Sequence, residues 1–404
     1  MNTALNVLHV HPVDVSGGGA KMVFQINDRL NEYADTTSKL LVGQKESTSD
    51  TVIELNRPFV EEAATQVLER YLSLDGLGSP SSFRLRRILR KHDIDVLHLH
   101  NIHGRYFNML NIPLVPESVE IVWTFHDMWP ITGNCAYSYG CERFRESCGS
   151  CPHLDEYPTI KLDTTSVLLG IKRRLFNRDI TVTVPSQWMY EHVEHSHLDQ
   201  PDLRHVPNGI DTDHFVPHDT DQARANYDIP EGDRVVLFVA SSIDNPQKDI
   251  GTLLKALERL PRKDTTTLLT IGGGDLPRER LADEFTVRAP GYIPEDELPM
   301  AYSAADVCVV PSRAESFGLV ATEAMACETP VVVSSVAGLK EQVSSEYGWL
   351  AEPGDPSSFA ETISQALQDT DSDYKGHLAR EHVLQNYRLS DCVKEYHRIY
   401  HEIS

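Results

Sequence analysis

Two series of short apolar segments, separated by stretches of helical periodicity, constrain the fold of this chain more than any other feature. The first series comprises residues 6–11, 95–100, 120–125 and 180–184, and the second comprises residues 234–240, 266–272, 305–311 and 330–334. Short apolar strands that alternate with helices are typical of parallel sheets built from βαβ units. The pattern therefore predicts an α/β fold with two Rossmann-like, doubly wound parallel sheets.

The length of the chain fits two such domains. It has 404 residues, whereas a single domain commonly has roughly 100–200. We place the first domain at residues 1–207 and the second at residues 208–389. Ser390 is positioned to cap a last helix, at about residues 390–404, whose apolar face contains Val393, Tyr396, Ile399 and Tyr400. We expect this helix to pack back onto the first domain.

The charge of the chain excludes some classes of function. With 37 Lys and Arg against 60 Asp and Glu, the net charge is −23, which disfavours binding to nucleic acid or to an anionic lipid surface. Such acidity is found in proteins from high-salt cytoplasms and also in ordinary acidic enzymes. Because there is no apolar run of about 18 residues and no signal-peptide pattern, we expect a cytoplasmic protein.

The most informative motif spans residues 311–326, where an apolar strand is followed by a loop and a helix. Glu315 is expected in the loop and Glu323 about two turns into the helix, so that both carboxylates can face one ligand. The amides of Phe317, Gly318 and Leu319 lie at the expected helix start, where unpaired N–H groups favour a diphosphate. Taken alone, two acidic residues at this spacing could also simply cap and solvate a helix.

The same segment carries a family resemblance. A Glu, seven residues and a second Glu, followed by Ala-Met-Ala and Thr-Pro-Val-Val, resemble the donor-binding motif of glycosyltransferase family 4, the group 1 glycosyl transferases of bacterial and archaeal polysaccharide biosynthesis. The resemblance implies the GT-B fold, with two facing domains and an inter-domain cleft. It also implies that Glu315 contacts the transferred sugar and Glu323 the ribose of the nucleotide.

The reaction implied by this resemblance is a retaining transfer without a catalytic metal. The donor would be a nucleotide-diphosphate sugar, with UDP or GDP as the nucleotide, and the acceptor a glycan or a lipid-linked glycan. Contact with a membrane would be peripheral at most, at its inner face.

Lys248 is the best candidate for a phosphate-binding cation. It follows the first strand of the second series, where an ammonium group could stabilise a departing diphosphate. Family members usually place an Arg a few residues earlier and a Gly directly after the Lys, whereas this chain has Ser241 and Ser242 in the first place and Asp249 in the second. A single lysine in a loop is otherwise most often solvated.

Three further segments resemble parts of the family's site. Gly18 and Gly19 belong to a glycine loop that would let the backbone approach the donor phosphate, although a plain turn would look the same. His126 ends a strand and would bond a sugar hydroxyl without carrying a permanent charge; His98, His100 and His103 are interpreted as structural. Ile293 belongs to a segment whose backbone would read the base.

Four cysteines form a separate cluster. Cys135, Cys141, Cys148 and Cys151 lie in one segment rich in Gly, Ser and Arg, and four thiolates ending in Cys-x-x-Cys could bind a structural zinc ion. Disulfides and free thiols remain alternatives. Cys308, Cys327 and Cys392 are interpreted as packing residues.

Two other functions remain open at this stage. A nucleotide-sugar epimerase of the GT-B type would share both domains and act on the donor alone. A non-catalytic nucleotide-sugar-binding protein would fit the missing Arg near Ser241. A nicotinamide enzyme is disfavoured because the glycines do not have the dinucleotide-binding spacing.

Overall fold

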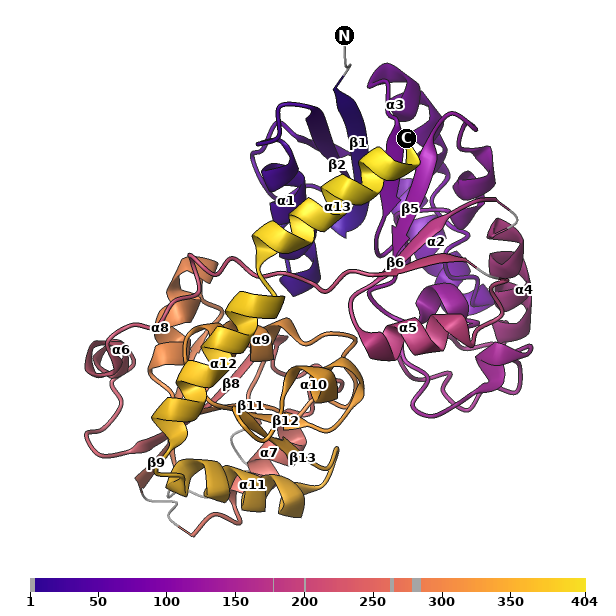
Figure 1. Cartoon of the computed structure of the whole chain (residues 1–404). Coiled ribbons are helices and arrows are strands. Elements are labelled where there is room, and N and C mark those ends of the chain that lie inside the picture. Colours follow the sequence, from indigo (N-terminus) through magenta and orange to yellow (C-terminus); the bar gives the residue numbers. More distant parts are fainter. Residues whose placement is uncertain (1–3, 177, 200, 262–264, 278–284) are drawn as a thin grey trace. The chain divides into compact units, whose positions relative to one another are not determined.

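The computed structural model describes residues 4–176, 178–199, 201–261, 265–277 and 285–404. The chain divides into two compact units, Met1–Pro207 with Cys392–Ser404, and Asn208–Asp391. We call them the first and the second domain; Figure 1 labels their elements. Each domain has one parallel sheet, so the predicted fold class of two Rossmann-like domains is confirmed.

The first domain is built on a seven-stranded sheet of order β3-β2-β1-β4-β5-β6-β7, in which every pairing is parallel. Its strands are β1 (Leu5–Val13), β2 (Thr36–Gln44), β3 (Val52–Glu54), β4 (Val96–Leu99), β5 (Glu120–Thr124), β6 (Thr181–Val184) and β7 (Asp202–His205). The strand order reverses between β1 and β4. Ligands of doubly wound sheets bind beside the carboxyl ends of strands at such a reversal.

Helices and 3-10 turns connect these strands. They are α1 (Gly18–Leu30), α2 (Phe59–Leu72), η1 (Pro80–Arg84), α3 (Leu85–Lys91), η2 (Met109–Leu114), η3 (Trp129–Ile131), η4 (Arg143–Arg145), α4 (Thr165–Leu175) and α5 (Gln187–Glu194). The core they enclose includes Trp123 and Trp129, neither of which is exposed to solvent.

The last helix, α13 (Leu389–Ile403), packs on the first sheet and is drawn in yellow in Figure 1. The buried hydroxyl of Tyr400 lies 2.5 Å from Nδ1 of His98 in β4, and that of Tyr396 lies 3.0 Å from Oγ1 of Thr124 in β5. The helix begins at Leu389, so Ser390 lies inside its first turn; its predicted role as the cap was wrong.

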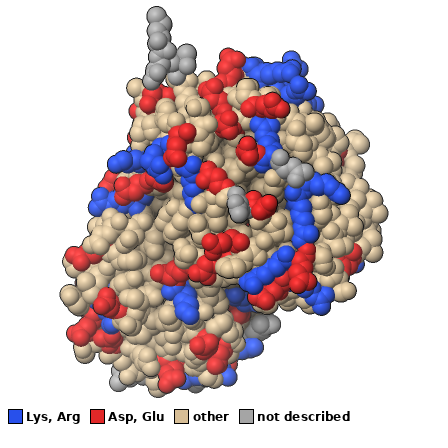
Figure 2. Space-filling view, turned by 45° about the vertical axis from the view of Figure 1, so that its right-hand side comes forward, with Lys and Arg blue, Asp and Glu red and all other residues tan. Residues whose placement is uncertain are grey.

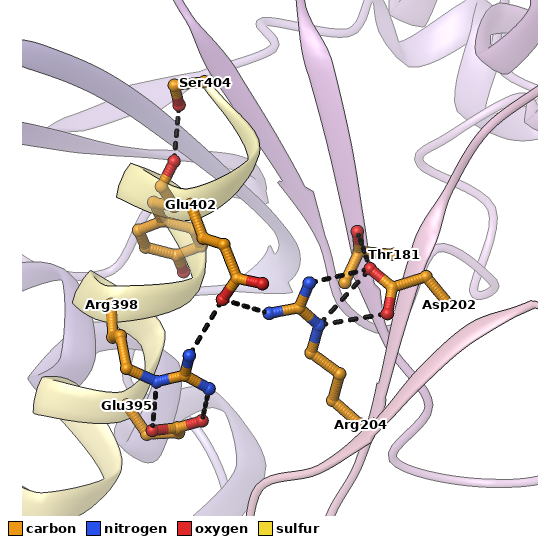
Figure 3. Close-up of polar contacts among 8 residues, drawn as sticks. Thr181, Asp202, Arg204, Glu395, Arg398, Glu402 and Ser404 are labelled. Atoms are coloured by element: carbon orange, nitrogen blue, oxygen red, sulfur yellow. Dashed lines mark hydrogen bonds and ion pairs between the residues drawn. The ribbon is translucent and has the colours of Figure 1, made fainter.

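A polar network also ties α13 to β7 (Figure 3). Arg204 of β7 contacts Glu402 at 2.9 Å and Asp202 at 2.9 Å, and Glu402 in turn accepts from Arg398 at 2.8 Å. Because Glu402 and Asp202 are about half exposed, water and salt screen these pairs. Exposed pairs of this kind contribute about 0–1 kcal/mol each, so the buried tyrosines hold the helix more firmly than the charges do.

The second domain is built on a six-stranded parallel sheet of order β10-β9-β8-β11-β12-β13. Its strands are β8 (Arg234–Ser242), β9 (Thr266–Gly273), β10 (Thr286–Gly291), β11 (Val307–Val310), β12 (Val331–Ser334) and β13 (Gly348–Ala351). Its helices are α6 (Thr220–Asn226), α7 (Ile250–Leu257), η7 (Glu295–Glu297), α8 (Leu298–Ser303), α9 (Leu319–Ala326), α10 (Ala337–Gln342), α11 (Pro356–Gln368) and α12 (Ser372–Asn386). Alternate residues of β8 and β11 join two separate apolar clusters, as a sheet covered on both faces requires.

On the face drawn in Figure 2, Lys and Arg are interspersed with Asp and Glu. This mixture differs from the continuous basic surface that binds a nucleic-acid phosphate backbone. Among the described residues, no helix combines the length and the apolar composition that crossing a bilayer demands.

Candidate active site

In the second domain, Glu315 lies in the loop between β11 and α9, at the carboxyl end of the sheet. Its carboxylate forms an ion pair with the ammonium group of Lys248 and accepts a hydrogen bond from Ser312 Oγ at 3.0 Å. The Glu315 side chain is 12% exposed and that of Lys248 is 23% exposed. The two residues that the sequence analysis selected separately are therefore brought together, and Glu315 faces Lys248 directly.

Lys248 reaches this position from the loop between β8 and α7. Gln247 fixes the loop, because its backbone carbonyl accepts from the amide of Arg313 at 2.8 Å and its side-chain amide donates to the carbonyl of Ala314 at 2.8 Å. Asp249 then caps α7 through Thr252. This capping role explains why an acidic residue follows Lys248. Ser241, which stands in the region where the resemblance predicts an Arg, is exposed.

Glu323 lies in α9, which begins at Leu319. It is therefore about one turn into the helix, and the predicted two turns were wrong because the helix starts later than the sequence suggested. Its carboxylate accepts a hydrogen bond of 2.6 Å from the hydroxyl of Tyr302, which is fully buried at the end of α8. This bond fixes the side chain while the residue keeps part of its surface exposed.

The start of α9 has the features of an anion site. Gly318 occupies the N-cap position with φ 87°, a conformation that favours glycine, and provides no side-chain cap. The amides of Phe317, Gly318 and Leu319 lie at this helix start, and their contact with a diphosphate stays a prediction. Beside them lies Gln342 of α10, whose side-chain amide is buried without a protein partner in the described part of the chain. Gln342 was not predicted from the sequence.

The segment after β10 contains Ile293, which was predicted to contribute its backbone to base recognition. Its side chain is 7% exposed and packs in the core of the second domain. Tyr292, directly before it, is largely exposed. The structure thus fixes the Ile293 backbone through its buried side chain, and contact with a base stays a prediction.

In the first domain, His126 follows the carboxyl end of β5 and is partly exposed. Its Nε2 lies 2.9 Å from Nδ1 of His100, whose Nε2 lies 3.0 Å from Nδ1 of His9 in β1. A neutral imidazole has one donor and one acceptor nitrogen, so both hydrogen bonds of His100 must run in the same direction along the chain. The tautomer of His126 is therefore coupled to those of two buried histidines.

Burial keeps these rings neutral. It lowers the pKa of His9 to about 3 and that of His126 to about 3, and it lowers the pKa of His100 well below its usual value, with the neighbouring histidines adding to the effect. A neutral His126 suits a contact with a sugar hydroxyl, as proposed from the sequence. His98, by contrast, is occupied by Thr124 and Tyr400 and is structural.

The residue after His126 forms an ion pair that the sequence did not suggest. Asp127 lies 2.9 Å from Nε2 of His103 and accepts from the amide of Trp129 at 2.8 Å. Burial alone would lower the pKa of His103 and raise that of Asp127, but each charge stabilises the other, so the pKa of His103 is raised and that of Asp127 is lowered. The pair holds the loop that follows β5.

Gly18 and Gly19 begin α1, directly after the loop that follows β1. Both are exposed, and a Cβ on Gly19 would meet no atom within 4 Å. The open helix start can therefore be approached by an anion, although nothing within the protein demands glycine at position 19.

The cysteine cluster lies between η3 and α4. Cys135, Cys141, Cys148 and Cys151 line one small cavity of about 20 Å³, and all are free thiols. Burial raises the pKa of Cys135 to about 12. Among the described residues, the groups with three or more potential metal-ligating atoms within 4.8 Å of one another are His9, His98 and His100, and Asp35, His397 and His401. The four cysteines share this cavity, but their sulfur atoms do not form such a group in the described part of the chain.

The chain matches two family models. Residues 57–214 match the model described as Glycosyltransferase Family 4, and residues 233–369 match the one described as Glycosyl transferases group 1. The two segments together account for most of the chain; the first lies in the first domain except for residues 208–214, and the second lies within the second domain.

Individual relatives and solved structures agree with the two family matches. The putative colanic acid biosynthesis glycosyl transferase WcaC of Escherichia coli is 24% identical over 85% of this chain and 86% of its own length. D-inositol 3-phosphate glycosyltransferase of Corynebacterium jeikeium is 31% identical over 56% of this chain and 58% of its own length. The structure of sucrose-phosphate synthase from Thermosynechococcus elongatus superposes with a TM-score of 0.76 at 22% identity, covering 99% of each chain. Anabaena Alr3699/HepE in complex with UDP-glucose superposes with a TM-score of 0.71 at 16% identity, covering 98% of this chain and 100% of its own.

The solved structures share the fold, and the family models and relatives share the sequence features of both domains. This protein therefore belongs to the group 1 glycosyl transferases, glycosyltransferase family 4, and has their GT-B fold of two Rossmann-like domains.

Proposed function

We propose that this glycosyltransferase moves a sugar, with retention of anomeric configuration, from a nucleotide-diphosphate sugar to a glycan or lipid-linked glycan. The observation that carries the proposal is the pairing of Lys248 with Glu315 at the carboxyl end of the second sheet. A cation and a hydrogen-bonding carboxylate lie side by side, next to the start of α9. A diphosphate and the sugar attached to it need these two groups at adjacent positions.

In this proposal, Lys248 and the amides at the start of α9 stabilise the charge that develops on the leaving nucleoside diphosphate. Glu315 bonds the hydroxyls of the transferred sugar, and Glu323, held by Tyr302, bonds the ribose. Lys248 supplies the positive charge at the diphosphate, so that no divalent metal ion is needed there. An oxygen of the leaving phosphate accepts the proton of the attacking hydroxyl. His126 would contact the donor sugar as a neutral hydrogen-bonding group.

The donor is proposed to be a UDP- or GDP-sugar. Support comes from the structural relative Alr3699/HepE, which was solved with UDP-glucose. A diphosphate would compete with Glu315 for Lys248, and this exchange would release the Glu315 carboxylate for the sugar. Donor binding and carboxylate positioning would then be one event.

The experiment has two stages. Nucleotide sugars are first screened by thermal unfolding, where a donor present at about a hundred times its Kd adds about 2.7 kcal/mol of stability. Release of nucleoside diphosphate is then followed with and without acceptors. Transfer predicts release that depends on the acceptor, whereas an epimerase would convert the donor without it and a binding protein would show neither.

Two variants test the assignment of residues. Glu315→Gln keeps the shape of the side chain and should lower kcat by about 100-fold or more, the range seen when one transition-state hydrogen bond or charge is lost. Lys248→Ala should weaken donor binding as well, and Lys255→Ala, an exposed lysine of α7, is its control. Unchanged turnover in Glu315→Gln would refute the proposed site.

We also propose that Cys135, Cys141, Cys148 and Cys151 bind one structural zinc ion, for which a small common cavity is the support. Four thiolates would have to close to about 2.3 Å from the metal. Purified protein should contain one equivalent of zinc, Cys151→Ser should lose it, and Cys392→Ser should keep it. A stable disulfide within the cluster, with no zinc, contradicts this proposal.

A further inference from the structure

The first domain contains a second cavity that the proposed donor site does not use. It has a volume of about 470 Å³ and is lined by Glu69, Asp75, Gly104, Arg105 and the segment from Tyr157 to Lys161. We call it the α2 pocket, because Glu69 lies in the last turn of α2. Gly104 and Arg105 belong to the loop that follows β4, so the pocket adjoins the carboxyl end of the first sheet.

One wall of the pocket has an unsatisfied polar group. Glu69 is 8% exposed, and its Oε2 accepts from Arg105 Nε at 3.2 Å, but its Oε1 is buried without a partner among the described residues. An unpaired buried polar atom is unfavourable and is rare in folded proteins. Because Glu69 lines the pocket, a hydroxyl group of a ligand there is the candidate partner for this carboxyl group.

The lining also includes an aromatic ring. Tyr157 is 60% exposed, and its ring stands edge-on to that of His103 with the ring centroids 5.8 Å apart. His103 is the partner of Asp127, the residue directly after His126. The pocket is thus linked by two contacts to the loop that carries the proposed sugar-binding histidine.

The pocket is lined by acidic and basic groups together. Glu69 and Asp75 oppose Arg105 and Lys161, and burial, followed by the charge of Asp75, raises the pKa of Glu69 to about 8. A Glu69 carboxyl that holds its proton can both donate and accept a hydrogen bond. Hydroxyl groups match this mixture of donors and acceptors.

We propose that the α2 pocket binds the acceptor as a neutral, hydroxyl-rich sugar, with Tyr157 against the ring face and Glu69 bonded to a hydroxyl. A sugar ring presents C–H groups on its face and hydroxyls at its edge, which suit an exposed aromatic ring beside a carboxyl group. The inference rests on the proposed function for its biological meaning, but the binding itself can be measured without a donor.

The test is saturation-transfer NMR on the full-length protein, with methyl glycosides of common hexoses and N-acetylhexosamines and with glucose 6-phosphate as an anionic comparison. At least one neutral glycoside should bind to the unaltered protein, and Tyr157→Ala and Glu69→Ala should each weaken that binding at least tenfold. Glu69→Gln, which can still donate and accept, should keep it within about threefold. Tyr374→Ala, at an exposed tyrosine of α12, is the matched control.

Three results would overturn the inference: no neutral glycoside binds, both alanine variants bind as well as the unaltered protein, or only the sugar phosphate binds in a way that depends on the pocket. The increase in thermal stability that the donor causes should be the same in all three pocket variants as in the unaltered protein. This result would confirm that the variants fold. A different result would contradict the proposed function and leave the pocket inference intact: a glycoside binds to the pocket but never promotes release of nucleoside diphosphate from any nucleotide sugar.

Discussion

At the scale of single residues, Gly338 shows how closely the candidate site is packed. A Cβ at this position would lie 2.1 Å from the carbonyl oxygen of Ser316, and the Gly338 amide donates to the carbonyl of Glu315 at 2.9 Å. The start of α10 therefore rests directly on the backbone of the loop that carries Glu315. Any side chain here would move that loop.

We accordingly expect Gly338→Ala to destabilise the protein by about 1–3 kcal/mol, as other overpacked sites do, and to weaken donor binding at the same time. Both effects can be measured by thermal unfolding with and without nucleotide sugar. Gly170→Ala in α4 is the control, because its Cβ would meet no atom within 4 Å and alanine favours the helix by about 0.5–1 kcal/mol. Equal behaviour of the two variants would contradict the packing argument.

At the scale of elements, α13 is held by buried aromatic residues. Tyr396 and Tyr400 are not exposed at all, and their hydroxyls contact Thr124 and His98. The ion pairs of Arg204 at the edge of the same interface are partly exposed (Figure 3). The two kinds of contact predict very different losses of stability.

Tyr400→Phe should destabilise the first domain by about 1–3 kcal/mol, because it leaves Nδ1 of His98 buried without a partner. Tyr400→Ala should destabilise it by about 3–5 kcal/mol, since a cavity is added. Arg204→Ala should change stability by less than about 1 kcal/mol. Denaturant unfolding of the three variants gives the order directly, and a larger effect for Arg204→Ala than for Tyr400→Phe would show that charge dominates this interface.

At the scale of the whole molecule, buried neutral histidines determine how stability depends on pH. The folded chain keeps His9 and His126 neutral down to about pH 3 and His11 down to about pH 4, whereas an unfolded histidine takes up a proton near pH 6.5. Below pH 6.5 the unfolded state therefore binds more protons. Acidification must favour unfolding, and the effect accumulates between pH 6.5 and about 3.

For His9 alone, the free energy of unfolding should fall by about 2 kcal/mol between pH 7 and pH 5. Denaturant unfolding across this range should show a steep decline, and His9→Gln should reduce the slope. His195→Gln, at an exposed histidine of the same domain, should leave it unchanged. A slope that is the same in His9→Gln and the unaltered protein would mean that another group controls acid unfolding.

Much of the architecture could be predicted from local patterns. The alternation of apolar strands with helical segments identified the fold class, and β1, β8 and β9 extend beyond the predicted segments by only a few residues. The interior strand β2 and the edge strands β3, β7, β10 and β13 were not predicted. Only three or four residues form β3, β7 and β13, and β10 is incompletely buried, so neither length nor hydrophobicity distinguished these edge strands.

The sequence by itself determined the two-domain α/β fold and the separate positions of Lys248, Glu315, Glu323 and His126, because each follows a recognisable strand or starts a recognisable helix. Only the tertiary structure decided that Lys248 pairs with Glu315, that His9 and His100 lie in line with His126, and that Glu69 lines a pocket with Tyr157. The physical reason is the range of the forces involved. Hydrophobic periodicity acts between near neighbours in the chain, whereas these contacts join side chains that are 26 to 91 positions apart and exist only once the sheets have set their strand order.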